Sequence, residues 1–109
     1  MTSANPTPII VALGVELTYS AREAAALLGR SYSWLDQRLR KDQFVLPYGT
    51  VVQPLRTPGG YRRFTLEMLK HIAISSYNHG WYSFSELKSV YYTLARDAYG
   101  DTDERKILG

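Results

Sequence analysis

Apolar residues recur along most of the chain at the three- and four-residue spacing of amphipathic helices, and polar caps mark where each helix begins. The first predicted helix opens at a capping box, Ser20 to Glu23, in which the serine accepts from the glutamate amide and the glutamate reaches back. Ala24 to Leu28 continue it with strong helix formers, and Gly29 supplies a left-handed stop. The pattern predicts a helix of about two turns.

A second helix is predicted directly after this stop. Ser31 or Ser33 caps it, and it runs to about Lys41. Two short helices joined by a tight turn form a helix-turn-helix. The apolar positions that fall three and four residues apart in the second helix are Trp34, Leu35 and Leu39.

Two longer helices are predicted in the second half of the chain. Thr65 caps the third helix, and His79 to Gly80 ends it. A second capping box, Ser83 to Glu86, opens the fourth helix, and Gly100 closes it. The apolar stripes are Leu66, Leu69, Ile72 and Ala73 in the third helix, and Phe84, Leu87, Val90, Tyr91, Leu94 and Ala98 in the fourth.

Between the two helix pairs lies the most informative stretch, Arg56 to Phe64. Pro58 presets φ for the first corner of a tight turn, and Gly59 is expected to take the positive φ of the second. The flanking residues, Val51 to Leu55 and Tyr61 to Phe64, are expected to pair as a short hairpin with arginines near its tip. Such a finger suits a polyanion groove, and the alternative is an ordinary solvated β-turn.

Length and composition indicate one globular domain with flanking segments. The chain has 109 residues, and we expect a flexible arm over residues 1–16, a folded domain over 17–100 and a charged tail over 101–109. The longest apolar run, Ile9 to Leu13, is far shorter than the roughly 20 residues that span a bilayer, and no signal peptide is visible. A cytoplasmic protein without membrane contact is therefore expected. Zero cysteines exclude disulfides and thiolate zinc sites.

Basic charge is concentrated in the middle third of the chain. Residues 30–63 contain seven Lys and Arg side chains against two Asp, a net charge of +5, whereas the remaining residues contain six against eight, a net charge of −2. A chance surplus of arginine would give the same count. We favour an electrostatic footprint for phosphates, because the predicted elements place these bases together.

The order helix, turn, helix, two-stranded wing, helix, helix resembles the DNA-binding domain of the MerR family, a mainly α winged helix-turn-helix with about four helices. The resemblance covers about Leu17 to Leu94. Thr18 to Gly29 is similar to the family's opening helix, Arg56 to Phe64 to its wing, and Gly80 to Leu87 to the link into its fourth helix. Among MerR-like proteins, the chain resembles compact phage excisionases and small regulators most.

The resemblance implies that the second helix lies in the major groove of DNA. Ser33, Asp36 and Gln37 would face the bases, where glutamine can bond adenine and aspartate can accept from cytosine. Tyr32 would reach bases or backbone. The other implied contacts are Arg38, Arg40 and Lys41 with phosphates, Arg62 with the backbone, Arg56 or Arg63 with a narrow minor groove, and Tyr61 with sugar-phosphate.

Several of these residues have a structural alternative. Arg40 and Lys41 are also explained as solvated helix ends, and Asp36 can pair with Arg40 four residues on. Trp34 is expected in the core. Two departures matter: Ser33 and Asp36 stand where many relatives carry arginines, and the connection before the wing is longer than usual by about Tyr48 to Val52.

Three functions remain open. The first is an architectural, excisionase-type factor that binds repeated sites, bends DNA and directs integrase-mediated excision. The second is a small MerR-like transcriptional regulator, and the third is a protein-binding adaptor that uses Ile9 to Leu13. The partners implied are double-stranded DNA, an integrase and further copies of the chain placed head to tail. No catalytic constellation can be assembled, and with only His71 and His79 neither a metal nor another cofactor is expected, so an enzyme is disfavoured.

Overall fold

The computed structural model describes residues 17–99 as a mainly α fold with one small antiparallel sheet. The expected arm over residues 1–16, the closing Gly100 and the tail over 101–109 lie outside the described residues. Within the described range the helices are α2 (Ala21–Leu27), α3 (Tyr32–Arg40), α4 (Leu66–Asn78) and α5 (Phe84–Tyr99), and the strands are β1 (Thr18–Tyr19), β2 (Leu55–Arg56) and β3 (Arg62–Thr65).

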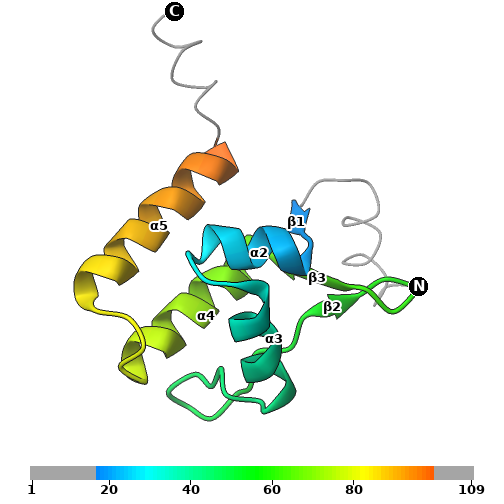
Figure 1. Ribbon diagram of the computed structural model, residues 1–109, viewed down its shortest axis with the longest axis horizontal. Helices are drawn as coiled ribbons and strands as arrows, with labels where there is room; N and C mark the ends of the chain where they lie inside the picture. The colour runs from blue at the N-terminus through cyan, green and yellow to red at the C-terminus, as the bar shows by residue number, and fades with distance from the viewer. Residues whose placement is uncertain (1–16, 100–109) are drawn as a thin grey trace, which may run out of the picture.

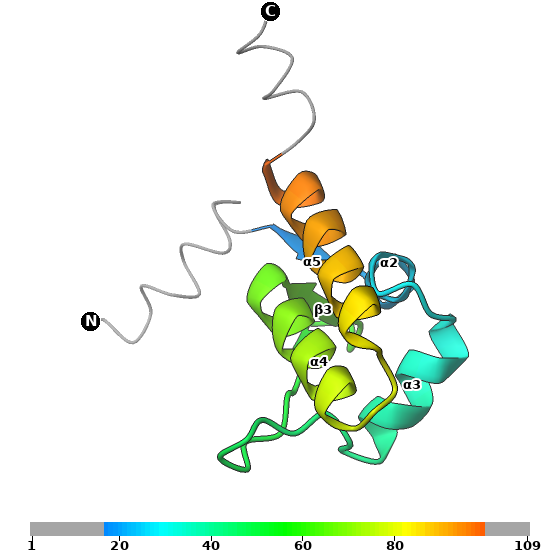
Figure 2. The same ribbon diagram turned by 90° about the vertical axis from the view of Figure 1, so that its left-hand side faces the viewer.

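The helices form two consecutive pairs around the sheet. A tight turn joins α2 to α3, and α4 and α5 lie side by side, as both views show (Figure 1, Figure 2). The hairpin made by β2 and β3 projects from the opposite side of the molecule to α5 (Figure 1). The core between these elements contains the fully buried side chains Leu28, Leu35, Phe44, Phe64, Leu69 and Ile72.

The predicted helix caps are confirmed. The Ser20 hydroxyl accepts from the Glu23 amide at 3.1 Å, and the Glu23 carboxylate accepts from the Ser20 amide at 2.8 Å. That backbone hydrogen bond holds the pKa of Glu23 below its usual range. The alternative at α3 is resolved in favour of Ser31, whose hydroxyl accepts from the Trp34 amide at 3.0 Å. Thr65 caps α4 through the Met68 amide.

The corner between α4 and α5 is fixed by a further cap and by a buried tyrosine. Ser83 and Glu86 form the second reciprocal capping box, with bonds of 2.8 and 3.0 Å. The Tyr82 hydroxyl donates to the Leu28 carbonyl at 2.6 Å, which ties this corner to the end of α2. Burial raises the pKa of Tyr82 to about 12, so the hydroxyl stays protonated and keeps its donor role at neutral pH.

The apolar stripe of α5 is only partly buried. Val90 and Leu94 of the expected stripe are buried, but Phe84 at the first position of the helix is 59% exposed. Its ring packs edge-on against Tyr77 at the end of α4, with centroids 6.1 Å apart. Helical spacing places Phe84 in line with the stripe, but among residues 17–99 it stands at the end of the α4–α5 pair and is left largely uncovered.

The sheet differs from the expected two-stranded hairpin in two ways. Its order is β1-β3-β2, so β1 adds a third strand that pairs Thr18 with Thr65. The hairpin itself is shorter than expected, because only Leu55 and Arg56 pair with β3. The expected start of that strand, Val51, instead bridges Val45 within the long connection. Phe44 and Leu46, on either side of Val45, are buried in the core.

The turn of the hairpin also corrects the expectation for its glycines. The Gly60 amide donates to the Thr57 carbonyl at 2.8 Å, which leaves Pro58 and Gly59 as the two central residues. The positive φ, +88°, belongs to Gly60 and not to Gly59. A left-handed residue placed after the turn is the arrangement of a hairpin with a glycine bulge.

The two glycines should therefore respond differently to alanine. We expect Gly60→Ala to lower the free energy of unfolding by about 1–2 kcal/mol, because an L-residue is strained in the left-handed region. At Gly59 an added Cβ would meet the exposed ring of Tyr61, 3.2 Å away, which can move aside, and Thr57 Oγ1 at an ordinary contact distance of 3.9 Å. Gly59→Ala should therefore change the free energy of unfolding by no more than about 0.5 kcal/mol. Urea denaturation of both variants measures the difference, and a larger loss at Gly59 would contradict the turn described here.

Candidate nucleic-acid interface

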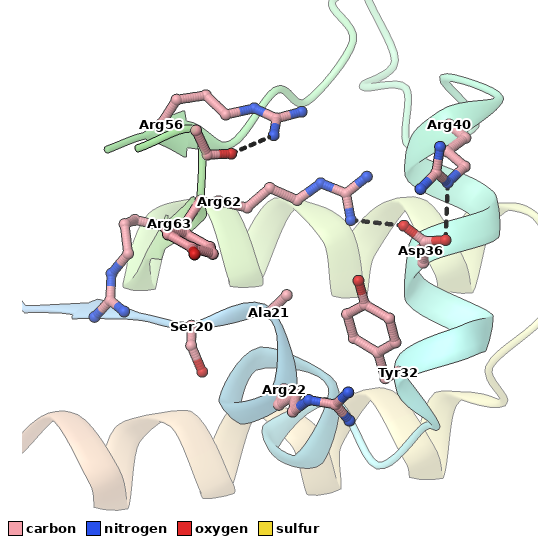
Figure 3. Close-up of a pocket in the computed structure, with 11 residues that line it drawn as sticks. Ser20, Ala21, Arg22, Tyr32, Asp36, Arg40, Arg56, Arg62 and Arg63 are labelled. Atoms are coloured by element: carbon pink, nitrogen blue, oxygen red, sulfur yellow. Dashed lines mark hydrogen bonds and ion pairs between the residues drawn. The ribbon is translucent and has the colours of Figure 1, made fainter. Parts of the chain in front are cut away.

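A basic cleft of about 610 Å³ separates α3 from the β2–β3 hairpin (Figure 3). The side chains that line it contain five arginines and one aspartate, a net charge of +4. They come from the start of α2, from α3 and from both strands of the hairpin. The lining residues are Ser20, Ala21, Arg22, Tyr32, Asp36, Arg40, Arg56, Gly60, Tyr61, Arg62 and Arg63.

The outer face of α3 carries the residues that were predicted to face DNA bases. Leu35 and Leu39 anchor the opposite face in the core. This anchoring leaves Ser33 and Gln37 exposed, one helical turn apart, and the Gln37 amide donates to the Ser33 hydroxyl at 3.3 Å. Their polar groups are therefore accessible and already aligned with one another. Tyr32 is also exposed and borders the cleft.

Asp36, the third predicted base-facing residue, is instead bound by two arginines. Its Oδ2 accepts from Arg40 Nε at 2.8 Å, and its Oδ1 accepts from Arg62 Nη1 at 2.9 Å (Figure 3). The hydrogen bonds from Arg40 and Arg62 hold the pKa of Asp36 below its usual range, so it is a carboxylate at neutral pH. The sequence alternative in which Asp36 pairs with Arg40 is the one that the structure contains.

The two partners of Asp36 differ in their access to solvent. The Arg40 side chain is 70% exposed, whereas those of Arg62 and Asp36 are only 12% and 18% exposed. Arg62 therefore forms a sheltered link from β3 to α3, while Arg40 lies at the rim of the cleft. Lys41 is exposed at the C-terminal end of the same helix.

The other hairpin arginines point in different directions. Arg63 donates to the Thr18 hydroxyl at 3.2 Å and to the Thr18 carbonyl at 3.0 Å, so it ties β3 to β1. Arg56 is exposed and donates to the Gly60 carbonyl at 2.8 Å, which braces the turn. Tyr61 beside it is 75% exposed. Of Arg56 and Arg63, the predicted minor-groove residues, Arg56 is the more accessible.

Arg38 lies away from the cleft, in a cluster of aromatic rings. Its guanidinium carbon lies 4.7 Å from the Trp34 ring centroid and 4.6 Å from that of Trp81. Nη1 donates to the Trp34 carbonyl at 3.3 Å, and Nε is buried with no hydrogen-bond partner among the described residues. Arg38 thus contributes to the packing between α3 and the α4–α5 corner, and its predicted phosphate contact stays a prediction. Trp34 itself packs against the core, as expected.

Sequence reasoning missed two further arginines. Arg22 on α2 lies over the Tyr32 ring at 4.8 Å and joins the lining of the cleft. The feature of the sequence that could have indicated Arg22 is its position as a basic residue between Ser20 and Glu23 of the first capping box. Arg30, in the turn before α3, donates to the Trp81 carbonyl at 2.9 Å and lies over the Tyr82 ring at 4.8 Å. No local sequence pattern predicts this contact, because Arg30 and Trp81 are 51 residues apart.

Metal-binding clusters and membrane-spanning helices are both absent from residues 17–99. Over this range no three His, Cys, Asp or Glu side chains gather closely enough to hold a metal ion. Bilayer-spanning length and apolar character are likewise not combined in any described helix.

The different environments of Arg38 and Arg40 lead to a stability prediction. We expect Arg38→Ala to lower the free energy of unfolding by about 1–2 kcal/mol, because it removes a desolvated cation between two rings together with its packed aliphatic stem. The matched variant Arg40→Ala should leave the denaturation midpoint unchanged, since its side chain is 70% exposed. Thermal or urea denaturation makes the comparison. Equal effects of the two substitutions would speak against the aromatic cluster.

Comparison with known proteins gives the chain a family but no described activity. No curated protein matches the chain, and no solved structure matches it either. A family model described as a domain of unknown function, DUF7229, matches residues 9–97. Because this match extends over most of the chain, the protein belongs to the DUF7229 family.

Proposed function

We propose that the protein binds double-stranded DNA sequence-specifically as a MerR-like winged helix-turn-helix. In this proposal α2 and α3 form the helix-turn-helix, and the β2–β3 hairpin is the wing. The observation that carries it is the cleft with a net charge of +4 between α3 and the hairpin. A concave surface of one sign focuses its field and attracts a polyanion. The order of the described elements is also compatible with this fold.

The exposed residues divide into candidates for base and for backbone contacts. Ser33 and Gln37 on the outer face of α3 present hydroxyl and amide groups, which suit base edges in the major groove. Arg40 and Lys41 at the end of the helix suit phosphates. Arg56 and Tyr61 project from the wing and suit the neighbouring backbone or minor groove. This division gives specificity to α3 and affinity to the arginines.

Within this class we favour an architectural, excisionase-type factor that bends DNA and directs an integrase toward excision. Such a role requires a surface that stays free for protein while DNA occupies the cleft. An apolar groove of about 380 Å³ follows α5. This helix lies on the opposite side of the molecule from the hairpin (Figure 1). Its lining residues are Phe84, Leu87, Lys88, Tyr91, Tyr92 and Ala95. An integrase is the partner that we assign to it.

A small MerR-like transcriptional regulator would use the same cleft and is the alternative. The arrangement of binding sites separates the two roles, because a twofold dimer requires an inverted repeat whereas head-to-tail copies require direct repeats. The protein-binding adaptor depends on Ile9 to Leu13, which lie outside the described residues.

Salt dependence and a single charge removal test DNA binding. We expect the affinity for duplex DNA to fall with salt with a log–log slope of about −0.9 for each phosphate contacted. Arg40→Ala should weaken binding to every sequence and make the slope shallower by up to about 0.9. Arg96→Ala removes the same charge from an exposed position on α5 and should change neither value. Fluorescence anisotropy measures both. If the purified protein ignored duplex DNA at modest ionic strength, the proposed function would be wrong.

Selection from random-sequence DNA followed by footprinting tests the architectural role. We expect two or more directly repeated footprints and an increased bend in the selected DNA, because copies that bind head to tail follow one strand direction. Gel mobility of circularly permuted fragments measures the bend. A single inverted repeat without bending would favour the transcriptional regulator instead.

A further inference from the structure

The cleft already contains an anion of its own. Asp36 supplies the only carboxylate among the described residues that line it, and both oxygens are bound by arginines, at 2.8 and 2.9 Å. Guanidinium groups bind carboxylates and phosphates with similar geometry and similar charge-assisted bonds. Asp36 therefore competes with a DNA phosphate for the same two guanidinium groups.

Asp36 also joins the two parts of the cleft mechanically. Leu35 and Leu39 fix α3 in the core, and Phe64 fixes β3 there, each with less than 10% exposure. The Asp36–Arg62 bond connects these two anchored elements across the cleft, with both side chains more than 80% shielded from solvent. A sheltered bond between two rigid elements restricts how far the hairpin can turn relative to α3.

We propose that Asp36 is a specificity-determining residue, which withholds Arg62 from DNA phosphates and fixes the distance between α3 and the hairpin. This inference rests on the DNA-binding function proposed above. Non-specific binding draws on phosphate contacts alone, so it is weakened by a carboxylate that binds one arginine and repels the phosphates. Binding at the correct site gains from the fixed geometry, because α3 and the hairpin are already placed for adjacent contacts. Asp36 thus lowers the affinity for non-specific DNA and also favours binding at the specific site.

Asp36→Asn tests the proposal with little change in shape. The probes are a random-sequence duplex and the duplex that the wild-type protein selects. We expect the variant to bind the random duplex about threefold to tenfold more tightly, with a log–log salt slope steeper by about 0.9, the contribution of one further phosphate. Affinity for the selected duplex should not rise, so the ratio of specific to non-specific affinity should fall by at least that factor.

Asp42→Asn is the matched control. It makes the same change of charge just beyond the end of α3, outside the lining of the cleft. Asp42 has a φ of +53°, which asparagine tolerates equally well, and its contact with Gln53 lies at the surface. We expect the affinity ratio and the salt slope of this variant to equal those of the wild type.

The possible outcomes separate this inference from the proposed function. If the wild-type protein binds no DNA, the proposed function fails and this inference fails with it. If the wild type binds but Asp36→Asn changes both affinities by one common factor, or changes neither, only the role of Asp36 is overturned. Circular dichroism checks the fold, and Asp36→Ser provides a second removal of the charge. Unfolding of both variants would also overturn the proposal, since Asp36 would then be a structural residue.

Discussion

The geometry of the basic cleft depends on one sheltered ion pair, between Arg62 on β3 and Asp36 on α3. An exposed ion pair of this kind contributes little to stability, because water screens both charges. Here the two side chains are only 12% and 18% exposed, so the bond is screened less and its geometry is better defined. It joins α3 and β3, which are each anchored in the core by apolar side chains and which form the two sides of the cleft.

Arginine serves two different purposes in this small fold. Arg30 and Arg38 lie over aromatic rings, where Trp34, Trp81 and Tyr82 join the start of α3 to the α4–α5 corner. These guanidinium groups contact aromatic rings of the protein itself. Arg40 and Arg56, by contrast, are exposed around the cleft. The basic surplus of residues 30–63 therefore overstates the number of cations that a phosphate backbone can reach.

The helices can be predicted from the sequence because their signals are local. A capping box requires two side chains three residues apart, and both predicted boxes are present, at Ser20 and Ser83. The strand β1 escapes prediction because two residues are too few to show an alternation. The sequence predicts the positive φ of the turn at Gly59, one residue too early, because Gly59 and Gly60 can both adopt a positive φ. The hydrogen bond from the Gly60 amide to the Thr57 carbonyl places it at Gly60.

The candidate site is less predictable than the fold, since several of its contacts join residues that are far apart in the sequence. The predicted elements bring most of these basic residues near the cleft, and four-residue spacing predicts the pairing of Asp36 with Arg40. The place of Arg22 in the lining and the partners of Arg62 and Arg63 do not follow from the sequence. Arg62 meets Asp36 across 26 residues, and Arg63 meets Thr18 across 45. Nothing in the spacing of these residues distinguishes a guanidinium that is bound within the protein from one that is free for a ligand.

The basic cleft and the apolar groove are formed by different elements, which bears on whether DNA and a protein could bind at the same time. The basic cleft lies between α3 and the hairpin, whereas the apolar groove follows α5. The hairpin and α5 lie on opposite sides of the molecule (Figure 1). A polyanion in the cleft would therefore leave the exposed rings of Phe84 and Tyr92 accessible to a protein. Desolvation of such rings stabilises a contact without drawing on the arginines, so the two ligands would not compete for the same groups. In the proposed function the domain holds DNA in the cleft and presents the groove of α5 to a protein, which is the physical requirement of an architectural factor.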